Sequence, residues 1–185
     1  MIVDYSQLEY IEQEHIYLYK GVIIPSVSQL LHEKVFPNKY KNIPKSILEK
    51  KAKYGSKVHS IIENIENHEE YVIDNVYIEE SIKQYNKIKT DNNILVISQE
   101  QIICYKGLYA GRYDMIAKIN GEICLVDIKT TAELDKEYLS WQLTMYEMGI
   151  GRKFDKLYCI WLPKGGLGKL VEIKRKSYEE IEKII

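Results

Sequence analysis

Tyr113-Asp-Met-Ile-Ala-Lys-Ile119 and Glu122-Ile-Cys-Leu-Val-Asp-Ile-Lys129 flank the dipeptide Asn120-Gly121. Asn-Gly between two alternating apolar runs is the strongest short-range signal for a β-hairpin with a two-residue turn. Counting back in step along both strands from that turn places Asp114 directly opposite Asp127. Their Cβ atoms would lie ~5 Å apart on one face of the hairpin. The pattern therefore predicts two adjacent antiparallel strands that bring a pair of carboxylates together.

Side chains two residues apart in a strand share a face, so this hairpin has two different surfaces. Lys129 points to the same face as Asp127, and Ile116 and Leu125 lie on that face too. The opposite face is apolar, and we expect it to be buried. Its residues are Tyr113, Met115, Ala117, Cys124, Val126 and Ile128. Because both faces carry apolar side chains, the strands are predicted to be covered on both sides, and the two acids are not simply exposed to solvent.

Two facing carboxylates repel one another, and a folded protein tolerates them if a cation lies between them. Oxygen ligands suit Mg²⁺ or Mn²⁺, and Mg²⁺ commonly takes only one or two carboxylates and leaves water and phosphate to complete its shell. A lysine beside such a site can orient or deprotonate a bound water, or stabilise charge on a phosphate. The alternative is an exposed hairpin whose acids pair with Arg112, Lys118 or Lys129, and the hairpin alone does not decide between the two.

The composition is that of an ordinary globular protein, with 185 residues of which 45% are hydrophobic and 29% charged, and a net charge of −1. We expect a single domain over residues 1–185. No apolar run reaches the ~20 residues of a membrane span. Residues 1–7 lack the basic and apolar regions of a signal peptide, so we expect a cytoplasmic protein. Cys104, Cys124 and Cys159 stand in apolar runs, which predicts buried thiols and neither disulfides nor a zinc site.

Positive charge gathers between residues 39 and 57, which include seven lysines and one acid, Glu49. Such a patch can bind a phosphate backbone, or it can be the solvated face of a helix, and the patch alone favours neither. The candidate phosphate-binding residues are Lys50, Lys51, Lys53 and Lys57, together with Arg112.

The rest of the chain predicts a mixed α+β fold, a central sheet with αβββαβ order flanked by helices. A hairpin and a helix are expected over about residues 14–35, with a turn near Lys20-Gly21 and a serine cap at Ser26. A long helix should run from Ser46 to about Asn67, and its apolar side is Ile47, Leu48, Val58, Ile61, Ile62 and Ile65. The later elements are a helix over 78–89, a loop over 90–93, strands over 95–105, 109–119 and 122–129, a helix over 134–149, strands over 156–162 and 170–175, and a helix over 178–185.

The long predicted helix carries Gly55, His59 and Glu63 at intervals of four residues, which places all three along one face. The glycine permits close approach of another backbone, and Glu63 could hold the imidazole. A lone helical histidine is more often structural than a ligand, so this face is not decisive by itself.

Three other positions could complete a site. Gln142 and Tyr146 stand four residues apart on a later helix and share a face, although alone they are a weak signal. Glu100 lies on the strand that precedes the Asp114 strand and could add an oxygen ligand. The side of the sheet to which the Glu100 side chain points depends on whether the turn at Lys106-Gly107 has two residues or three, and the sequence leaves that open.

Together these motifs resemble the PD-(D/E)XK nuclease superfamily, in the branch of RecB-like nuclease domains and phage-type exonucleases. The resemblance covers about residues 46–162 and is specific in its aspartate, DxK and QxxxY spacing. Tyr113 stands where the name of the superfamily has proline. The matching motifs are Gly55-x₃-His59-x₃-Glu63, Glu100, Gly111-Arg-Tyr-Asp114, Asp127-Ile-Lys129-Thr-Thr131 and Trp141-Gln142-x₃-Tyr146.

The resemblance implies a restriction-endonuclease-like core and a role for each matching residue. The implied metal ligands are His59, Asp114, Asp127 and the main-chain carbonyl of Ile128, with Glu100 as a further candidate. Lys129 would be the catalytic lysine, and Gln142 and Tyr146 would support the site and contact the substrate strand. One or two Mg²⁺ or Mn²⁺ ions are implied. Iron–sulfur members need four cysteines at characteristic positions, so no such cluster is expected in a chain with three cysteines elsewhere.

The function implied by the resemblance is metal-dependent hydrolysis of DNA phosphodiester bonds, in the first place by an exonuclease of recombination, replication or repair. The alternatives are a structure-specific or restriction-like endonuclease, and a non-catalytic DNA-binding subunit that keeps the nuclease fold. The implied partners are DNA and either a second copy of the chain or recombination and replication proteins, without a membrane.

Overall fold

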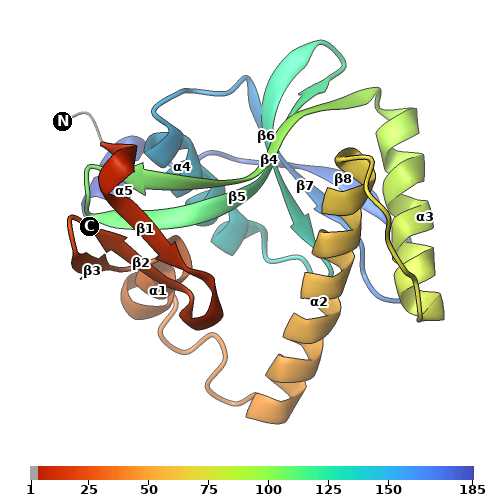
Figure 1. The fold of residues 1–185 in the computed structure, drawn as a ribbon, viewed down its shortest axis with the longest axis horizontal. Helices are drawn as coiled ribbons and strands as arrows, with labels where there is room; N and C mark the ends of the chain where they lie inside the picture. Colours follow the sequence, from red (N-terminus) through yellow and green to blue (C-terminus); the bar gives the residue numbers. More distant parts are fainter. Residues whose placement is uncertain (1–3) are drawn as a thin grey trace.

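The computed structural model describes residues 4–185, so the first three residues of the segment searched for a signal peptide lie outside it. A five-stranded mixed sheet forms its centre, in the order β4-β5-β6-β7-β8 (Figure 1). All neighbouring strands are antiparallel except β6 and β7, which are parallel. The strands are β4 (Ile94–Tyr105), β5 (Tyr109–Ile119), β6 (Glu122–Lys129), β7 (Lys156–Trp161) and β8 (Lys169–Ile173). This confirms the predicted mixed α+β class with a central sheet.

The β5–β6 hairpin has the predicted turn and register. Its pairing runs from Ile119 opposite Glu122 to Met115 opposite Val126. Asn120 and Gly121 both have positive φ angles, 50° and 96°, as a type I′ turn requires. All six residues of the face predicted to be buried are buried, and five of them pack together under α2 and α3. Tyr113 is the exception, because it packs with Leu125 and Tyr146 on the α4 side, so the prediction was wrong for its facing. The turn residues therefore determine which side chains face the core.

Helices cover both faces of the sheet, as the apolar residues on both faces predict. Helices α2 (Lys45–Glu66) and α3 (Val76–Asp91) pack on the β5–β6 face that carries Met115 and Val126. The opposite face, which carries Leu125, packs against α4 (Lys136–Ile150). Figure 1 shows α2 and α3 together on the right of the molecule. Because α4 connects the parallel strands β6 and β7, it also serves as the crossover that such a pair needs.

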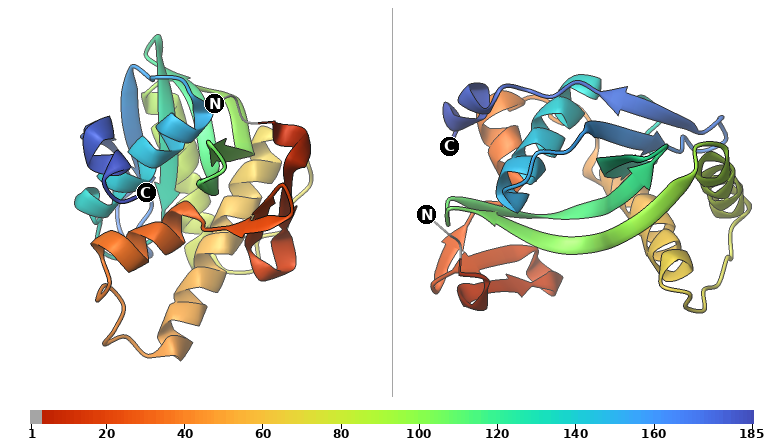
Figure 2. Two further views of the ribbon diagram at one scale, coloured as in Figure 1. Left: turned by 90° about the vertical axis from the view of Figure 1, so that its left-hand side faces the viewer. Right: turned by 90° about the horizontal axis from the view of Figure 1, so that it is seen from above.

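A second, three-stranded sheet is formed by β1 (Leu8–Ile11), β2 (Ile16–Tyr19) and β3 (Val22–Ile24). The predicted hairpin with its turn at Lys20-Gly21 is confirmed, whereas β1 was not predicted. Tyr17 and Ile24 pack on Cys104 and Ala110. Figure 2 shows this N-terminal sheet beside the long β4 and β5 strands, away from α3. After β3, Ser26 caps α1 (Val27–Leu30) in a capping box with Gln29.

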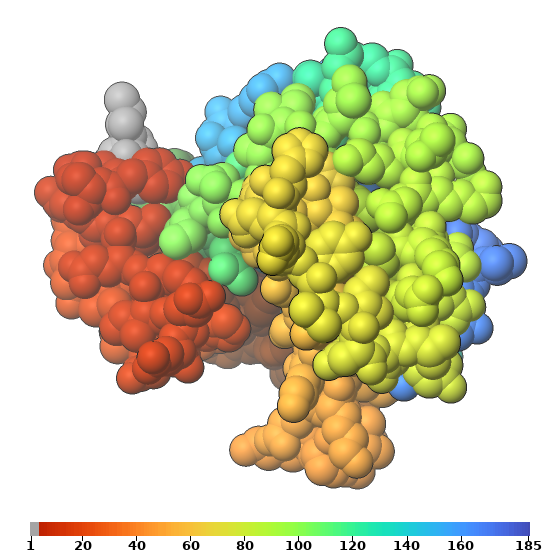
Figure 3. All heavy atoms as spheres, turned by 45° about the vertical axis from the view of Figure 1, so that its right-hand side comes forward, coloured from red at the N-terminus to blue at the C-terminus, as the bar shows by residue number. Residues whose placement is uncertain are grey.

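Several predicted boundaries need correction. Ile47 is 43% exposed and does not belong to the apolar side of α2, because the first turns of that helix project beyond the body of the molecule (Figure 3). Thr90 and Asp91 belong to α3, so the predicted loop begins only after them. Helix α4 begins after Asp135, whose side chain accepts a hydrogen bond from the backbone N–H of Tyr138. The last helix, α5 (Tyr178–Glu182), is shorter than predicted.

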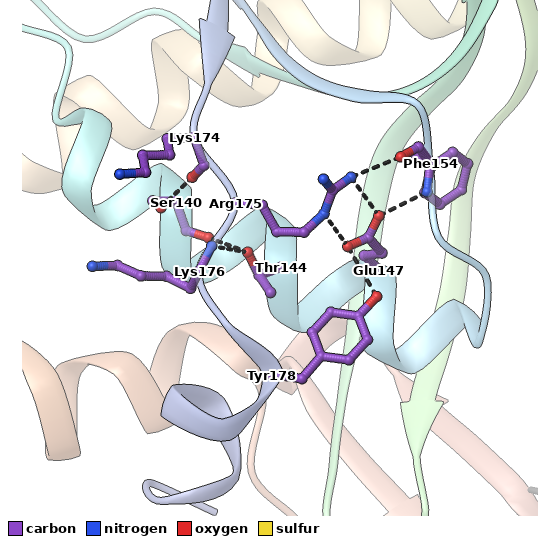
Figure 4. A network of polar contacts seen from close by, with 8 residues as sticks. All are labelled: Ser140, Thr144, Glu147, Phe154, Lys174, Arg175, Lys176 and Tyr178. Carbon is purple, nitrogen blue, oxygen red and sulfur yellow. Dashed lines mark hydrogen bonds and ion pairs between the residues drawn. The ribbon is translucent and has the colours of Figure 1, made fainter.

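A buried polar network attaches the C-terminal segment to α4 (Figure 4). The Glu147 carboxylate is fully buried and accepts hydrogen bonds from Arg175 Nε at 2.6 Å and Arg175 Nη2 at 2.9 Å. It also accepts bonds from the Phe154 backbone N–H and the Tyr178 hydroxyl. Burial, and then the Glu147 carboxylate, raise the pKa of Tyr178 to about 12. This network could not be expected from the sequence, because a single glutamate in a helix carries no sign that it is buried.

Cys104, Cys124 and Cys159 are buried free thiols, as predicted. In the part of the chain that the structure describes, every helix is too short or too polar to cross a membrane.

Candidate functional site

The candidate site begins where the β5–β6 pairing stops. The paired ladder ends at Met115 and Val126, and the next residues along each strand are Asp114 and Asp127. The two aspartates lie beyond the last paired residues, and their carboxylates are not joined to each other. Asp114 Oδ2 instead accepts a hydrogen bond of 2.6 Å from the backbone N–H of Ile128. The Asp114 carboxylate thus supplies the acceptor that further strand pairing would have supplied.

Helix α2 brings His59 onto this point. His59 Nε2 lies 3.0 Å from the main-chain oxygen of Ile128, and Nδ1 lies 3.6 Å from Asp114 Oδ1. A carbonyl oxygen can only accept, so Nε2 must carry the hydrogen of this bond. In a singly protonated ring, Nδ1 then carries a lone pair, and this lone pair faces the Asp114 carboxylate. The Ile128 carbonyl, predicted as a metal ligand, is occupied by His59 in this arrangement.

Gly55, one turn before His59, permits the close approach of α2. A Cβ atom at this position would lie 3.2 Å from Thr130 Oγ1, tighter than an ordinary contact. Glu63 does not hold the imidazole as expected, because within residues 4–185 neither a hydrogen bond nor an ion pair joins its carboxylate to His59. The Glu63 charge acts on Glu100 instead and contributes to the raised pKa of that group.

Strand β4 supplies Glu100, the third acidic or imidazole side chain of the candidate site. The loop between β4 and β5 has three residues, because Tyr105 pairs with Tyr109. This register brings Glu100 to the position opposite Asp114, with a left-handed φ of 51°. One ligand atom from each of His59, Glu100 and Asp114 lies within 4.8 Å of the others. Burial, and then the Asp114 charge, raise the pKa of Glu100 to about 8.

Asp127 and Lys129 form a buried ion pair next to this cluster. The Asp127 side chain is 2% exposed, and Lys129 Nζ lies 2.8 Å from Oδ1 and 2.7 Å from Oδ2. Burial raises the pKa of Asp127 to about 6, against the opposing effect of Lys129 and with a further increase from Asp114. Burial disfavours the charged ammonium, but Asp127 and Asp114 outweigh it and raise the pKa of Lys129. Lys129 is therefore an ammonium group here and not a base.

The predicted Gln142–Tyr146 pair lies on the same side. Gln142 Nε2 donates to the Tyr146 hydroxyl at 3.1 Å, and both side chains are buried. Burial, and then Asp114, raise the pKa of Tyr146, so its hydroxyl keeps its proton. A Cβ atom at Gly111 would lie 2.7 Å from Tyr146 Cε1. The glycine of the Gly111-Arg-Tyr-Asp114 motif therefore makes room for this ring.

Arg112 is not a free cation. Its Nε forms an ion pair with Glu100 Oε2 at 2.8 Å, and its Nη1 lies 3.9 Å from Glu12 Oε1. The guanidinium carbon also lies 5.9 Å from the centre of the Tyr10 ring. Arg112 thus connects the site to the N-terminal sheet. Neither Tyr10 nor Glu12 was a candidate from the sequence, because nothing in the pattern placed the N-terminal sheet beside β5.

Only part of the lysine-rich stretch over residues 39–57 is available to contact a phosphate backbone. Lys39 is paired with Asp135, and its ammonium lies 3.8 Å from the centre of the Tyr138 ring with 17% of the side chain exposed. Lys45 pairs loosely with Glu49 at 3.8 Å. Lys50, Lys51, Lys53 and Lys57 are exposed on α2. Lys51 precedes His59 by eight residues, which places it about two turns earlier and ~80° around the helix axis from His59.

The site lies between α2 and the N-terminal sheet. Figure 3 shows the surface hollowed between these two parts, with the first half of α2 projecting beyond the body. Of the five expected metal ligands, the structure gathers His59, Glu100 and Asp114 in one cluster. Asp127 and the Ile128 carbonyl lie beside it but are engaged by Lys129 and His59.

Comparisons with known proteins add little. The chain matches no family model and no curated protein. Among solved structures it is similar to the crystal structure of SSO0001, with a TM-score of 0.44 and 16% sequence identity, over 87% of this chain and 72% of that chain. A likeness of this degree says nothing about function, which we therefore infer from the residues of the site itself.

Proposed function

We propose that this protein is a Mg²⁺- or Mn²⁺-dependent deoxyribonuclease with a restriction-endonuclease-like core of the PD-(D/E)XK type. The observation that carries the proposal is the cluster of His59, Glu100 and Asp114, which come from α2, β4 and β5. Next to the cluster lies the Asp127–Lys129 pair from β6. These residues come from four separate elements of the chain, and each belongs to a motif of the resemblance.

The donor set fits a divalent cation. His59 Nδ1 and the carboxylates of Glu100 and Asp114 are all acceptors if the imidazole is singly protonated, and acceptors this close repel one another unless a cation or a proton lies between them. Burial is the first cause of the raised pKa of Glu100, and the Asp114 charge adds to it, as this repulsion requires. Carboxylate oxygens, which dominate the set, suit Mg²⁺ and Mn²⁺.

The cation, as one ion or two, would stabilise charge on the scissile phosphate and lower the pKa of a bound water. His59, Asp114 and Glu100 would hold it, together with Asp127 once Lys129 moves aside. The raised pKa of Lys129 fits a role in which the ammonium offsets negative charge on the phosphate, and not one in which it removes a proton. Gln142 and Tyr146 would position the substrate strand with neutral donors.

The exposed lysines of α2 support DNA as the substrate. Lys50, Lys51 and Lys53 lie on the helix that carries His59 and could guide a phosphate backbone toward the site. Reversing their charge with glutamate should weaken DNA binding and reduce its salt dependence more than it reduces the rate at saturating DNA. The matched control is glutamate at Lys83 and Lys87, which lie on α3.

The test of the proposal is digestion of end-labelled single- and double-stranded DNA with Mg²⁺ or Mn²⁺, with EDTA as the blank. We expect cleavage to fall by at least ~10²-fold in Asp127→Asn and Lys129→Ala. Asp91→Asn and Lys118→Ala are the controls, since both residues are exposed. Undiminished cleavage by Lys129→Ala would refute the assigned role.

Closed circular DNA separates the exonuclease from its alternatives. An exonuclease leaves closed circles intact and degrades linear DNA, whereas a restriction-like or structure-specific endonuclease opens circles. A protein that binds DNA but cleaves neither form with either cation would be the non-catalytic module, and the proposed activity would be wrong.

A further inference from the structure

Arg112 lies between the candidate site and the N-terminal sheet, and Glu100 provides its close contact. The Nε–Oε2 distance is 2.8 Å, and the Glu100 side chain is only 14% exposed. The other contacts of Arg112 are looser, with Glu12 at 3.9 Å on an exposed side chain and the Tyr10 ring at 5.9 Å. If Glu100 released the guanidinium, the exposed Glu12 at 3.9 Å would be the remaining acid in ion-pair contact with it among residues 4–185.

Glu100 is also a member of the cluster formed with His59 and Asp114. A divalent cation bound there would share the Glu100 carboxylate with the positive charge of Arg112. Two positive charges a few ångströms apart in a partly buried site repel strongly. The cation and the guanidinium therefore compete for one carboxylate.

We propose that Arg112 is a substrate-positioning residue that Glu100 holds in the cation-free protein and releases to a nucleic-acid phosphate when a divalent cation takes Glu100. This inference rests on the proposed function and adds a regulatory contact to it. The guanidinium is suited to the second role because its donors match the oxygens of a phosphate. Binding of the cation and of DNA would then strengthen each other, and by linkage the effect is reciprocal.

A different arrangement would make the loss of Arg112 change the cation affinity in the opposite direction. Glu100 could keep Arg112 on one oxygen and bind the cation with the other, so that Arg112 orients the ligand. Loss of Arg112 would then weaken cation binding. Under the proposed competition, Arg112→Ala removes a competitor and tightens cation binding.

Two measurements on the full chain test the proposal. Titration calorimetry with Mn²⁺ in the absence of DNA should give a dissociation constant at least ~3-fold lower for Arg112→Ala than for the wild type. Fluorescence anisotropy with a labelled oligonucleotide should show binding ~10-fold weaker for Arg112→Ala in Ca²⁺, the loss of about one charge-assisted hydrogen bond, and nearly unchanged binding in EDTA. Gel analysis of the same samples checks that the oligonucleotide is intact in Ca²⁺.

Lys118→Ala is the matched control, because it removes one positive charge from an exposed position of the same strand. Weaker Mn²⁺ binding by Arg112→Ala, or equal loss of DNA affinity with and without cation, would overturn the proposal, as would unchanged DNA affinity in Ca²⁺. A wild-type protein that binds neither Mn²⁺ nor DNA would end the proposed function and this inference together. Normal wild-type binding with any of the contrary Arg112 results would end this inference alone.

Discussion

Lys129→Met should destabilise the protein, although we propose a role in catalysis for this residue. The substitution leaves the 2%-exposed Asp127 carboxylate without the ammonium that now contacts both of its oxygens. Removing one partner of a buried ion pair typically costs about 3–5 kcal/mol. Lys129 is 26% exposed, so solvent screens part of the interaction. We therefore expect a loss of about 2–3 kcal/mol in the free energy of unfolding at pH 8 in EDTA.

The stability lost in Lys129→Met should depend on pH, and the titration of Asp127 determines whether it grows or shrinks as the pH rises. Burial already raises the pKa of Asp127 to about 6 with Lys129 present, and removal of the ammonium raises it further. An acid whose pKa is raised by folding favours the folded state at low pH, and this contribution is lost as the pH rises through the folded pKa. The cost of Lys129→Met should then be smaller at pH 5.5 than at pH 8. Adding Asp127→Asn should recover most of the stability.

Urea unfolding followed by tryptophan fluorescence, at both pH values and in EDTA, measures these differences. Lys118→Met is the control, since Lys118 is exposed on the neighbouring strand. If Lys129→Met is as stable as the wild type at pH 8, Lys129 does not hold Asp127 in solution. A loss that is equal at the two pH values would show that the cost comes from packing and not from an unpaired carboxylate.

Three further outcomes follow from single contacts. Glu147→Gln should lower the free energy of unfolding by about 3 kcal/mol in chemical denaturation, because the amide leaves the partly buried Arg175 without a counter-charge. In EDTA the melting temperature should fall as the pH rises from 4.5 to about 8, because Glu100 binds its proton more tightly when folded, and Glu100→Gln should flatten that slope. Gly111→Ala should displace the Tyr146 ring, whose Cε1 would lie 2.7 Å from the new Cβ, and lower the free energy of unfolding by about 1–3 kcal/mol. Under the proposed function it should also lower the rate of DNA cleavage.

The β5–β6 hairpin could be predicted in detail because its information is local. Asn120-Gly121 fixes a two-residue turn, and the turn fixes the register of every pair up to Met115 and Val126. The bounds of β5 and β6 agree with the prediction residue for residue. Helix α2 was predicted equally well from its apolar spacing, apart from the end that projects into solvent.

Side-chain partners in the site could not be predicted, because they depend on where strand pairing stops and on segments distant in sequence. The register pointed Asp114 at Asp127, but the ladder ends one pair earlier and Asp114 turns to the Ile128 N–H. The ion pair between Lys39 and Asp135 joins residues nearly a hundred positions apart. The contact of Arg112 with Glu100 depends on a three-residue β4–β5 loop, which Lys106-Gly107 alone did not specify.

These partners indicate how the cation-free protein tolerates so many acids in one place. Lys129 forms an ion pair with Asp127, and the Ile128 N–H donates a hydrogen bond to Asp114. Glu100 pairs with Arg112, and the pKa of Glu100 is itself raised. Each of these contacts satisfies a carboxylate that the proposed divalent cation would need, so binding of that cation would have to displace some of them. Under the proposed function, the cation affinity would then be a difference between new ligand bonds and lost internal ones. It follows that variants which remove an internal partner, and variants which remove a ligand, should change that affinity in opposite directions.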